Sequence, residues 1–473
     1  MANRTEEDFL GKVEVPSGAY YGIFTVRASK NFQISNSKPS RDFIRMLALV
    51  KKSAAQANLE CGNLGNSTGK AIVRACSEVA DGKFDSEFIL DAYTAGAGTP
   101  FNMNMNEVIA NRAEELLGGK KGQYKKVHPN NTVNMSQSSN DVIPTAIRLM
   151  LLHQSKEVIS EAEKLAREIQ KKEKEFSKLV RAGRTHLMDA VPLTVADELS
   201  AFSSSLVSDA ARISAASDCL RMLPIGGTAL GSGINTHPQY RKTVVRRISE
   251  NTGIPVKEGG NLFSLISQAS DFLNYSSALR GLAATVHKLS NDLKLLSSGP
   301  NTMVGEYILP EVEPGSSIMP GKVNPSIPEC AEMIANRVIA NDQAVLLATL
   351  GGQLQLNVQT PLILQSLAES NLLLANGIHM LRIHCMAGLK LNREKIAKNL
   401  GASLISLTAL APYFGYEKMS ELVKAAQKEK LGIRKVVLRQ GLLSEKEYGR
   451  IMSPDKLTRP SLREKLTKKP KRT

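Results

Sequence analysis

Tryptophan is absent from this chain of 473 residues, and aromatic residues of all kinds make up only 5% of it. A core with so few rings has to be filled by aliphatic side chains, Ala and Met, which suits close helix–helix packing better than a β-sandwich. No apolar run reaches the roughly 20 residues that a membrane-spanning helix needs, so we expect no membrane segment. The hydrophobic content of 42% then indicates a soluble globular protein.

Cysteine is scarce and scattered, because Cys61, Cys76, Cys219, Cys330 and Cys385 form no CxxC pair. Neither they nor the seven histidines have the spacing of a structural metal site. The segment before residue 19 lacks the apolar centre of a secretory signal. We therefore expect a cytoplasmic location, no disulfide framework and no metal site.

Acidic residues are outnumbered by basic ones, and the formal net charge at pH 7 is +16. Part of the excess lies in residues 456–473, where eight basic residues face Glu464 alone. A basic surface can attract nucleic acids, acidic proteins or small dicarboxylates. No aromatic residues are interleaved to form a base-stacking surface, so we expect no nucleic-acid partner and a solvated tail.

The most informative segment is Gly-Ser-Ser-Ile-Met-Pro-Gly-Lys-Val-Asn-Pro at residues 315–325. Its glycines and prolines constrain the backbone, and no apolar periodicity predicts a core helix or a strand. Two hydroxyls (Ser316 and Ser317), the Lys322 ammonium and the Asn324 amide lie within it. This mixture favours a loop that surrounds an anion over an ordinary surface turn.

Helical spacing of apolar residues dominates from about residue 140 onward. Several stretches are about 30 residues long, well above the ~11–12-residue average, and they are rich in Ala, Leu and Ser, which indicates a helix bundle. Shorter helices are expected near the carboxyl end, with breaks at Gly415, Gly432 and Pro454. The longer helices are expected over residues 143–176, 195–223, 262–296, 326–350 and 361–391, and two further helices are expected in the N-terminal region over 43–59 and 71–79.

These patterns divide the chain into three expected domains. A mixed N-terminal region covers residues 1–138, a helical bundle covers 139–391, and small helices with a basic tail cover 392–473. The glycine-rich run at 226–233 lies between helical stretches rather than after a strand, which argues against a dinucleotide-binding turn.

Three segments together resemble the aspartase/fumarase superfamily. They are the 315–325 loop, the paired regions GAGTPFNMNMNE (96–107) and HPNNTVNMSQSSND (128–141), and GRTHLMDAVP at 183–192. The resemblance extends over nearly the whole chain. It implies a mainly α, three-domain fold with a central long-helix bundle, and a homotetramer whose active sites combine segments from three subunits.

The resemblance also implies a reaction on a four-carbon dicarboxylate. Removing a proton from carbon next to a carboxylate gives an aci-carboxylate, which requires a base together with cations and hydrogen-bond donors. Ser316 matches the family's base, and its alkoxide would need support from loop amides and Lys322. Lys322 and Asn324 match family positions that bind carboxylate. No organic cofactor is implied.

Further substrate contacts are implied outside this loop. Ser138, Ser139 and Asn140 precede an expected helix, where free N–H groups favour an anion, although simple N-capping is equally compatible with this sequence. The remaining matches are Thr99, Thr185, His186 and Glu329, the last two as a His–Glu pair that would bias the imidazole toward its charged form. A second anion site, at His128, Asn130 and Asn131, lacks the acidic residues of its fumarase counterpart, and we leave it out of the expected active site.

The leaving group is ammonia or water. Features that resemble aspartases are AYYG at 19–22, GQLQLNV at 352–358 and the pair Pro328-Glu329. Features that resemble class II fumarases are SQSSND and NMNMNEVIANRA, and Ser139 stands where aspartases usually have Thr. We favour deamination of L-aspartate to fumarate, with fumarate hydration as the alternative. A relative recruited only for binding would be expected to lose the serine loop or His186, and both are present.

Overall fold

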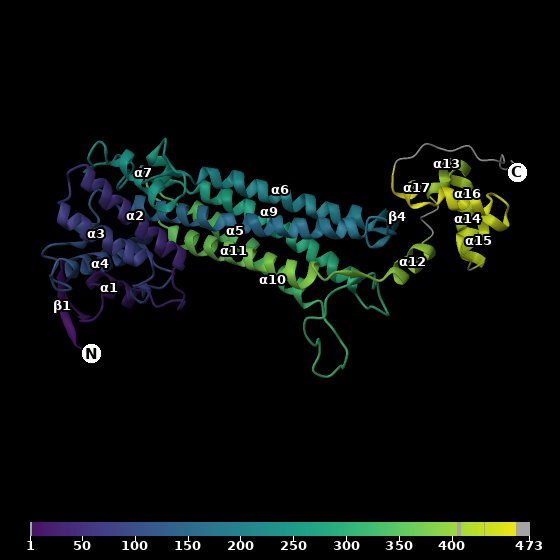
Figure 1. The fold of residues 1–473 in the computed structure, drawn as a ribbon, viewed down its shortest axis with the longest axis horizontal. Helices are drawn as coiled ribbons and strands as arrows, with labels where there is room; N and C mark the ends of the chain where they lie inside the picture. The colour runs from purple at the N-terminus through teal and green to yellow at the C-terminus, as the bar shows by residue number, and fades with distance from the viewer. Residues whose placement is uncertain (1, 404–407, 430, 460–473) are drawn as a thin grey trace. The chain divides into compact units, whose positions relative to one another are not determined.

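The protein is described here by a computed structural model, in which residues 2–403, 408–429 and 431–459 are described. Helices predominate in this part of the chain, as the sequence predicts (Figure 1). Contacts divide the chain into two compact units that each combine separated segments. Unit 1 contains residues 2–161, 209–284 and 334–376, and unit 2 contains 162–208, 285–333 and the described residues from 377 to 459. The three-domain division at residues 138 and 391 stays a prediction.

Unit 1 begins with a hairpin of β1 (Asn3–Asp8) and β2 (Gly11–Pro16), followed by α1 (Ile23–Asn31). Helices α2 (Arg41–Glu60) and α3 (Asn66–Ala80) pack against each other and confirm the two helices expected there. The apolar face of α2 packs against α3 and against residues 240–252, which buries Phe43, Leu47 and Val50. The other helices near it are α4 (Thr99–Leu116) and α7 (Tyr240–Thr252).

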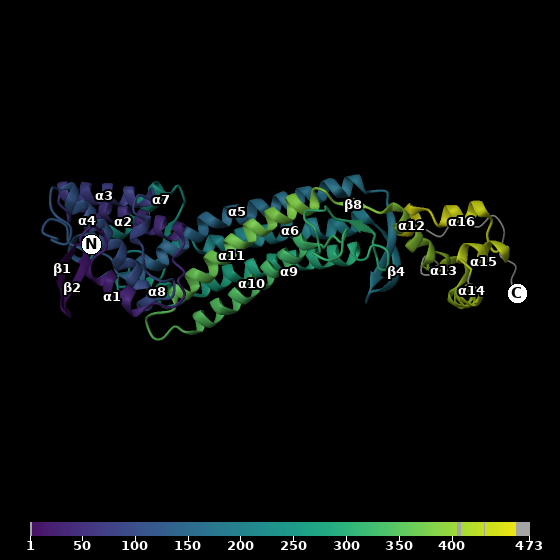
Figure 2. The same cartoon turned by 90° about the horizontal axis from the view of Figure 1, so that it is seen from below.

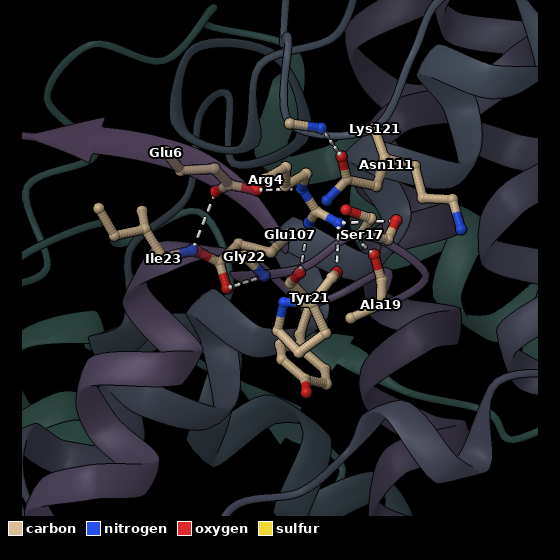
Figure 3. A network of polar contacts seen from close by, with 12 residues as sticks. Arg4, Glu6, Ser17, Ala19, Tyr21, Gly22, Ile23, Glu107, Asn111 and Lys121 are labelled. Atoms are coloured by element: carbon tan, nitrogen blue, oxygen red, sulfur yellow. Dashed lines mark hydrogen bonds and ion pairs between the residues drawn. The ribbon is translucent and has the colours of Figure 1, made fainter. Parts of the chain in front are cut away.

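The first turn of α1 is capped by acidic side chains from elsewhere in unit 1 (Figure 3). Gly22 has no side chain to cap the helix, so Glu107 accepts its N–H over 2.9 Å, and Glu6 accepts the N–H of Ile23 over 3.0 Å. A Cβ at Gly22 would lie 2.8–2.9 Å from these carboxylates, which explains the glycine. Burial raises the pKa of Glu107 to about 7, although hydrogen bonds from Thr25 and the α1 backbone oppose the rise. The Ala-Tyr-Tyr-Gly motif therefore supports folding.

The bundle is formed by five long helices, which run alongside one another in Figures 1 and 2. In unit 1, Tyr275 donates to Asn371 over 2.7 Å, and Arg280 pairs with Asp342 over 2.6 Å. In unit 2, Ser203 donates to Glu173 over 2.5 Å. The helices are α5 (Ser139–Glu175), α6 (Val195–Cys219), α9 (Ser270–Ser297), α10 (Ser326–Leu350) and α11 (Thr360–Leu381). This arrangement confirms the mainly α fold with a long-helix bundle.

Three of the expected helices are shorter than predicted. The helix predicted over 195–223 ends at Cys219, because β5 (Met222–Leu223) pairs with β6 (Lys257–Glu258). The helix predicted over 262–296 is split into α8 (Leu262–Ser267) and α9, since Gln268 is extended. The helix predicted over 361–391 ends at Leu381. A short π-helix (Arg382–Met386) follows, and then β8 (Lys390–Leu391), which pairs with β7 (Tyr307–Ile308).

Short helices form the carboxyl-terminal part of unit 2, with breaks at Gly415 and Gly432 as predicted. Pro454, predicted as a third break, is the first residue of a helix, because proline is well tolerated at that position. Gly415 follows α13 with φ of 79° and ψ of 163°, backbone angles that glycine adopts readily and other residues rarely do. The basic tail from residue 460 lies outside the described residues. None of the described helices combines the length and apolarity required to cross a membrane. The helices are α12 (Arg393–Ala402), α13 (Ala411–Phe414), α14 (Tyr416–Glu429), α15 (Ile433–Arg439), α16 (Glu445–Ile451) and α17 (Pro454–Thr458).

Candidate active site

The serine loop, residues 315–325, is closed by its own backbone in unit 2. The Gly315 N–H donates to the Lys322 carbonyl over 2.8 Å, and the Asn324 amide donates to the Gly315 carbonyl over 2.7 Å. A Cβ at residue 315 would lie 2.7 Å from both Asn324 N and Lys322 O, so only glycine permits this closure. The loop is thus held in shape without helix or strand, as the sequence predicts.

Two backbone amides converge on the Ser316 hydroxyl. Its Oγ accepts the N–H of Ile318 over 3.2 Å and that of Met319 over 3.1 Å. Donors that point at an oxygen stabilise negative charge on it, so this arrangement lowers the cost of forming a serine alkoxide. The Lys322 ammonium is exposed and makes no ion pair within the described residues, which leaves it available to an anion.

Thr185 and His186 lie at the tip of a hairpin formed by β3 (Val180–Thr185) and β4 (Met188–Thr194). Thr185 pairs with Met188, so His186 and Leu187 form a two-residue turn, with φ of 56° and 61°. Positive φ at both central residues is the requirement of a type I′ turn. The His186 side chain is exposed at one wall of a cavity of about 270 Å³.

A buried carboxylate anchors this hairpin. Glu306 accepts from Arg181 over 2.9 Å and from Arg184 over 2.7 Å, and the Asn399 amide adds a bond of 2.8 Å. Burial alone would raise the pKa of Glu306, but these hydrogen bonds and the two guanidinium charges hold it below its usual value. The backbone before His186 is therefore fixed by an ion network that the sequence analysis missed.

In unit 1, the residues predicted to contact a carboxylate, Ser138, Ser139 and Asn140, lie at the start of α5. Ser138 is the N-cap, since its hydroxyl accepts the Asn140 N–H over 3.2 Å and its own N–H donates to Asp141 over 2.9 Å. The Asn140 side-chain amide donates to the Ala229 carbonyl over 2.8 Å. The predicted N-cap is confirmed, and Ser138 is one of the residues that line the adjacent cavity.

Ser139 is held by a residue of α4. Its Oγ accepts from the Asn102 amide over 3.0 Å, which joins the starts of α4 and α5. A cavity of about 380 Å³ lies beside these helix starts. Two buried polar atoms among its lining residues, Asn102 Oδ1 and Thr228 Oγ1, have no partner within the described residues. The cavity is lined by Asn102, Met103, Asn134, Ser136, Gln137, Ser138, Ser139, Thr228, Ala229, Ile234 and Asn235.

Thr99 begins α4, next to the pocket that contains Ser139. Left-handed Gly98, with φ of 80°, turns the chain into the helix, and a Cβ there would lie 3.0 Å from Ile143. The Thr99 hydroxyl donates to the Gly96 carbonyl over 2.6 Å and is not among the residues that line the cavity. Thr99 is placed near the pocket by the helix that also supplies Asn102.

The predicted site residues thus fall into groups within each unit. Thr99 and residues 138–140 lie in unit 1, whereas the hairpin tip, the serine loop and Glu329 lie in unit 2. Glu329 is in the first turn of α10 and is exposed. No hydrogen bond or ion pair joins it to His186 among the residues that the structure describes, so their pairing stays a prediction.

Sequence reasoning missed two charged residues, Lys51 and Asp141, that hydrogen-bond to the segments around the cavity. Lys51 lies on the buried face of α2, four residues after Leu47, and could have been found as a lysine on an apolar stripe. Asp141 accepts the N–H groups of Gly226 and Thr228 over 3.0 and 2.9 Å, contacts that depend on distant parts of the chain. Within the described residues, no group of three or more His, Cys, Asp or Glu could hold a metal ion.

Comparisons with known proteins agree over nearly the whole chain. A lyase family model matches residues 11–340, and a model of the fumarase C C-terminus matches residues 407–459. A class II fumarate hydratase from Campylobacter jejuni is 42% identical over 97% of this chain and 100% of its own length. An aspartate ammonia-lyase from Pseudomonas canavaninivorans is 43% identical, over 97% of this chain and 98% of its own.

Solved structures agree with the sequence relatives. A fumarate lyase:delta crystallin from Brucella melitensis superimposes with a TM-score of 0.94 at 40% identity, covering 97% of this chain and 100% of that one. A class II fumarase from Schistosoma mansoni gives a TM-score of 0.93 at 35% identity, over 96% and 98% of the two chains. Relatives of both reaction types are therefore similar to this chain to nearly the same degree.

Proposed function

This chain belongs to the aspartase/fumarase superfamily of lyases, and on that premise we propose that it converts L-aspartate reversibly to fumarate and ammonia. The observation that carries the proposal is the pair of backbone N–H groups that point at Ser316 Oγ. A serine hydroxyl is a poor base unless its alkoxide is stabilised, and these donors supply that stabilisation.

Ser316 removes a proton from the carbon next to one substrate carboxylate. The electron pair left behind delocalises into that carboxylate and gives an aci-carboxylate with two negative charges. Lys322 supplies a positive charge and Asn324 a hydrogen-bond donor for this group, which forms only as the proton leaves. The C–N bond then breaks, and ammonia departs as the double bond of fumarate forms.

The second carboxylate is held at the start of α5. Ser138 and Ser139 line the cavity at the N-terminus of a 37-residue helix, where free N–H groups favour an anion. Asn140, Thr99 and Thr185 add polar contacts. His186, paired with Glu329, helps bind a carboxylate, since a neighbouring acid favours the charged imidazole.

A homotetramer accounts for the separation of these groups along the chain. Each active site then takes the α5 start, the hairpin tip and the serine loop from different subunits. The exposed positions of His186, Lys322 and Glu329 support this arrangement, because each is free to meet another copy. We propose a cytoplasmic location, which the five scattered cysteines of the sequence favour.

Class II fumarate hydratase is the second candidate, and Ser139 is the observation that favours it. The Thr usual in aspartases at this position helps shape the pocket around the amino group, and Ser139 lacks its methyl group. GQLQLNV at 352–358 and Pro328-Glu329 favour ammonia. The Ala-Tyr-Tyr-Gly motif carries less weight, because its backbone belongs to the network around Glu107 and lines no part of the cavity.

The test is to follow fumarate by its ultraviolet absorbance with the purified full-length chain, offering L-aspartate and L-malate separately. Fumarate from aspartate alone, with an equimolar yield of ammonia, is the expected result. Fumarate from malate alone would make the protein a fumarase and give Ser139 the deciding weight. No fumarate from either substrate would reject both reactions.

A further inference from the structure

Lys51 is a fully buried cation in α2, with none of its surface exposed. Its ammonium donates to Asn134 Oδ1 and to Gln137 Oε1, each over 2.9 Å. Both partners are neutral amides, and Lys51 makes no ion pair within the described residues. Burying a charge is costly unless something compensates it, so its presence here calls for a role.

The two amides connect Lys51 to the cavity that contains Ser139. Asn134 and Gln137 both line that cavity. Asn134 Oδ1 also accepts from Asn102 over 3.2 Å, and Asn102 donates onward to Ser139. Lys51 thus lies at one end of a hydrogen-bonded chain that ends at the cavity wall.

The charged and titratable groups that interact with or adjoin Lys51 are Asp141, Cys76 and Lys52. Asp141 of α5 is the neighbouring acid, but its carboxylate is occupied by the N–H groups of Ser138, Gly226 and Thr228. Cys76 of α3 is buried, and burial raises its pKa to about 12, which keeps the thiol neutral. Lys52, the next residue on α2, is partly exposed and makes no ion pair in the described part of the chain.

We propose that Lys51 is a positioning residue for the carboxylate pocket: it holds residues 134–139 in their binding shape, and its charge adds to the affinity for a four-carbon dicarboxylate. This inference rests on the proposed function for the identity of the ligand. In a low-dielectric interior an ammonium acts strongly on an anion that enters a nearby cavity, because little water screens it. The amides between them transmit the effect by orienting their dipoles.

The charge of Lys51 should depend on pH near neutrality. Burial lowers its pKa to about 7, and the Asp141 charge opposes that fall. The cation is present below this pKa and lost above it, so dicarboxylate affinity should decrease as the pH rises through 7. A bound carboxylate favours the ammonium, so binding should also take up protons at pH values near and above 7.

The test is calorimetric binding of succinate to full-length variants, from about pH 6 to about pH 9. Lys51→Met should bind about tenfold or more weakly at the low end and approach the unaltered chain at the high end. Lys51→Arg should retain the affinity and lose most of its pH dependence, because a guanidinium stays charged. What remains should come from Asp141, because burial raises the pKa of this neighbouring acid to about 7. Lys52→Met, which removes the same charge one residue away, should match the unaltered chain throughout.

Kinetics and hydrogen exchange separate positioning from general damage. Lys51→Met should raise KM by about the same factor as it weakens succinate binding, with kcat changed less than about threefold. Amides of residues 134–139 should exchange faster in unliganded Lys51→Met than in Lys51→Arg. If Lys51→Met does not fold, proton uptake on succinate binding is compared between the unaltered chain and Lys51→Arg. Uptake near pH 7 should be larger in the unaltered chain, because only there can Lys51 gain a proton, and equal uptake would overturn the inference.

Equal affinity and equal pH dependence in Lys51→Met and the unaltered chain would overturn the inference, while fumarate production would still stand. Turnover of neither substrate, together with succinate binding that weakens in Lys51→Met, would reject the proposed function and leave the inference intact. Failure of the unaltered chain to bind succinate would also overturn the inference.

Discussion

The Asn102 amide donates to the Ser139 hydroxyl over 3.0 Å, so this hydroxyl is fixed by a neighbouring helix. Ser139→Thr keeps the hydroxyl and adds one methyl group at the cavity wall. We expect the ratio of kcat/KM for aspartate to that for malate to rise about tenfold, within the range that one methyl group supplies in a pocket. Steady-state kinetics on both substrates measure this ratio.

Ser139→Ala serves as the companion variant. It removes the hydroxyl without adding volume, so it should lower kcat/KM for both substrates together. An unchanged ratio in Ser139→Thr would mean that the leaving group is selected elsewhere in the site.

Ser316→Ala tests the proposed base. The variant lacks the atom that takes the proton, so turnover should fall by about 10⁴-fold or more, as with loss of other catalytic nucleophiles and bases. The loop is exposed and braced by the Gly315–Lys322 and Asn324–Gly315 bonds, so the fold and succinate binding should persist. Initial rates and calorimetry on one preparation provide both measurements.

Ser317→Ala is the matched control for this variant, because Ser317 is the adjacent exposed serine. It should retain turnover within a few-fold. Substantial activity in Ser316→Ala would remove Ser316 from the role of base and redirect attention to other groups of the loop.

Glu306→Gln tests the anchor of the β3–β4 hairpin. The change leaves Arg181, which is 2% exposed, without its full counter-charge, so we expect a loss of about 3–5 kcal/mol in unfolding free energy. Because the native pKa of Glu306 is below its ordinary value, its contribution is present above about pH 4.5 and lost as the pH falls through the native pKa. Urea unfolding of both proteins from neutral to acid pH measures the difference.

Glu311→Gln controls for the loss of one acid from the same segment, since Glu311 is exposed. It should unfold like the unaltered chain. If Glu306→Gln were equally stable at neutral pH, the buried ion network would not be what anchors the hairpin.

His128 gives the unfolding free energy a second pH dependence, because the folded chain favours its neutral imidazole. Its Nδ1 accepts the N–H groups of Asn130 and Asn131 over 3.1 and 3.3 Å, and burial lowers its pKa. The unfolded chain therefore binds the proton more tightly, and this contribution to stability falls as the pH drops below about 6.5. His128→Asn keeps an acceptor for the turn and should remove that dependence.

Unfolding curves of the two proteins between about pH 5 and pH 8 are to be compared. Their difference should be constant above neutrality and shrink on acidification. If the difference in unfolding free energy stays constant over the whole range, the pKa of His128 is the same in the folded and the unfolded chain, and the prediction is wrong.

Local signals were enough to predict much of this fold, including the loop that contains Ser316. The 326–350 helix has the predicted bounds, and the absence of periodicity at 315–325 correctly indicated a loop. The carboxylates and amines that support the site were not predicted. Glu306 meets Arg181 from more than 100 positions away, and Asp141 meets Gly226 and Thr228 from more than 80, so no local pattern records these contacts.

The same limit explains the shortened helices. Met222 and Leu223 continue the apolar spacing of α6, yet their segment pairs with residues 257–258 in a parallel bridge. Helical spacing specifies which side chains can be buried together, but a pairing with a distant strand decides whether the backbone stays helical.

The tip of the β3–β4 hairpin has a consequence for attempts to make this protein more heat-resistant. His186 and Leu187 both have left-handed backbones, at a cost of about 1–2 kcal/mol for each such residue, whereas Asn-Gly adopts this turn readily. Selection for melting temperature alone would favour Asn-Gly at residues 186–187 and remove the His186 imidazole. Thermostability screens of this chain therefore need a simultaneous selection for turnover.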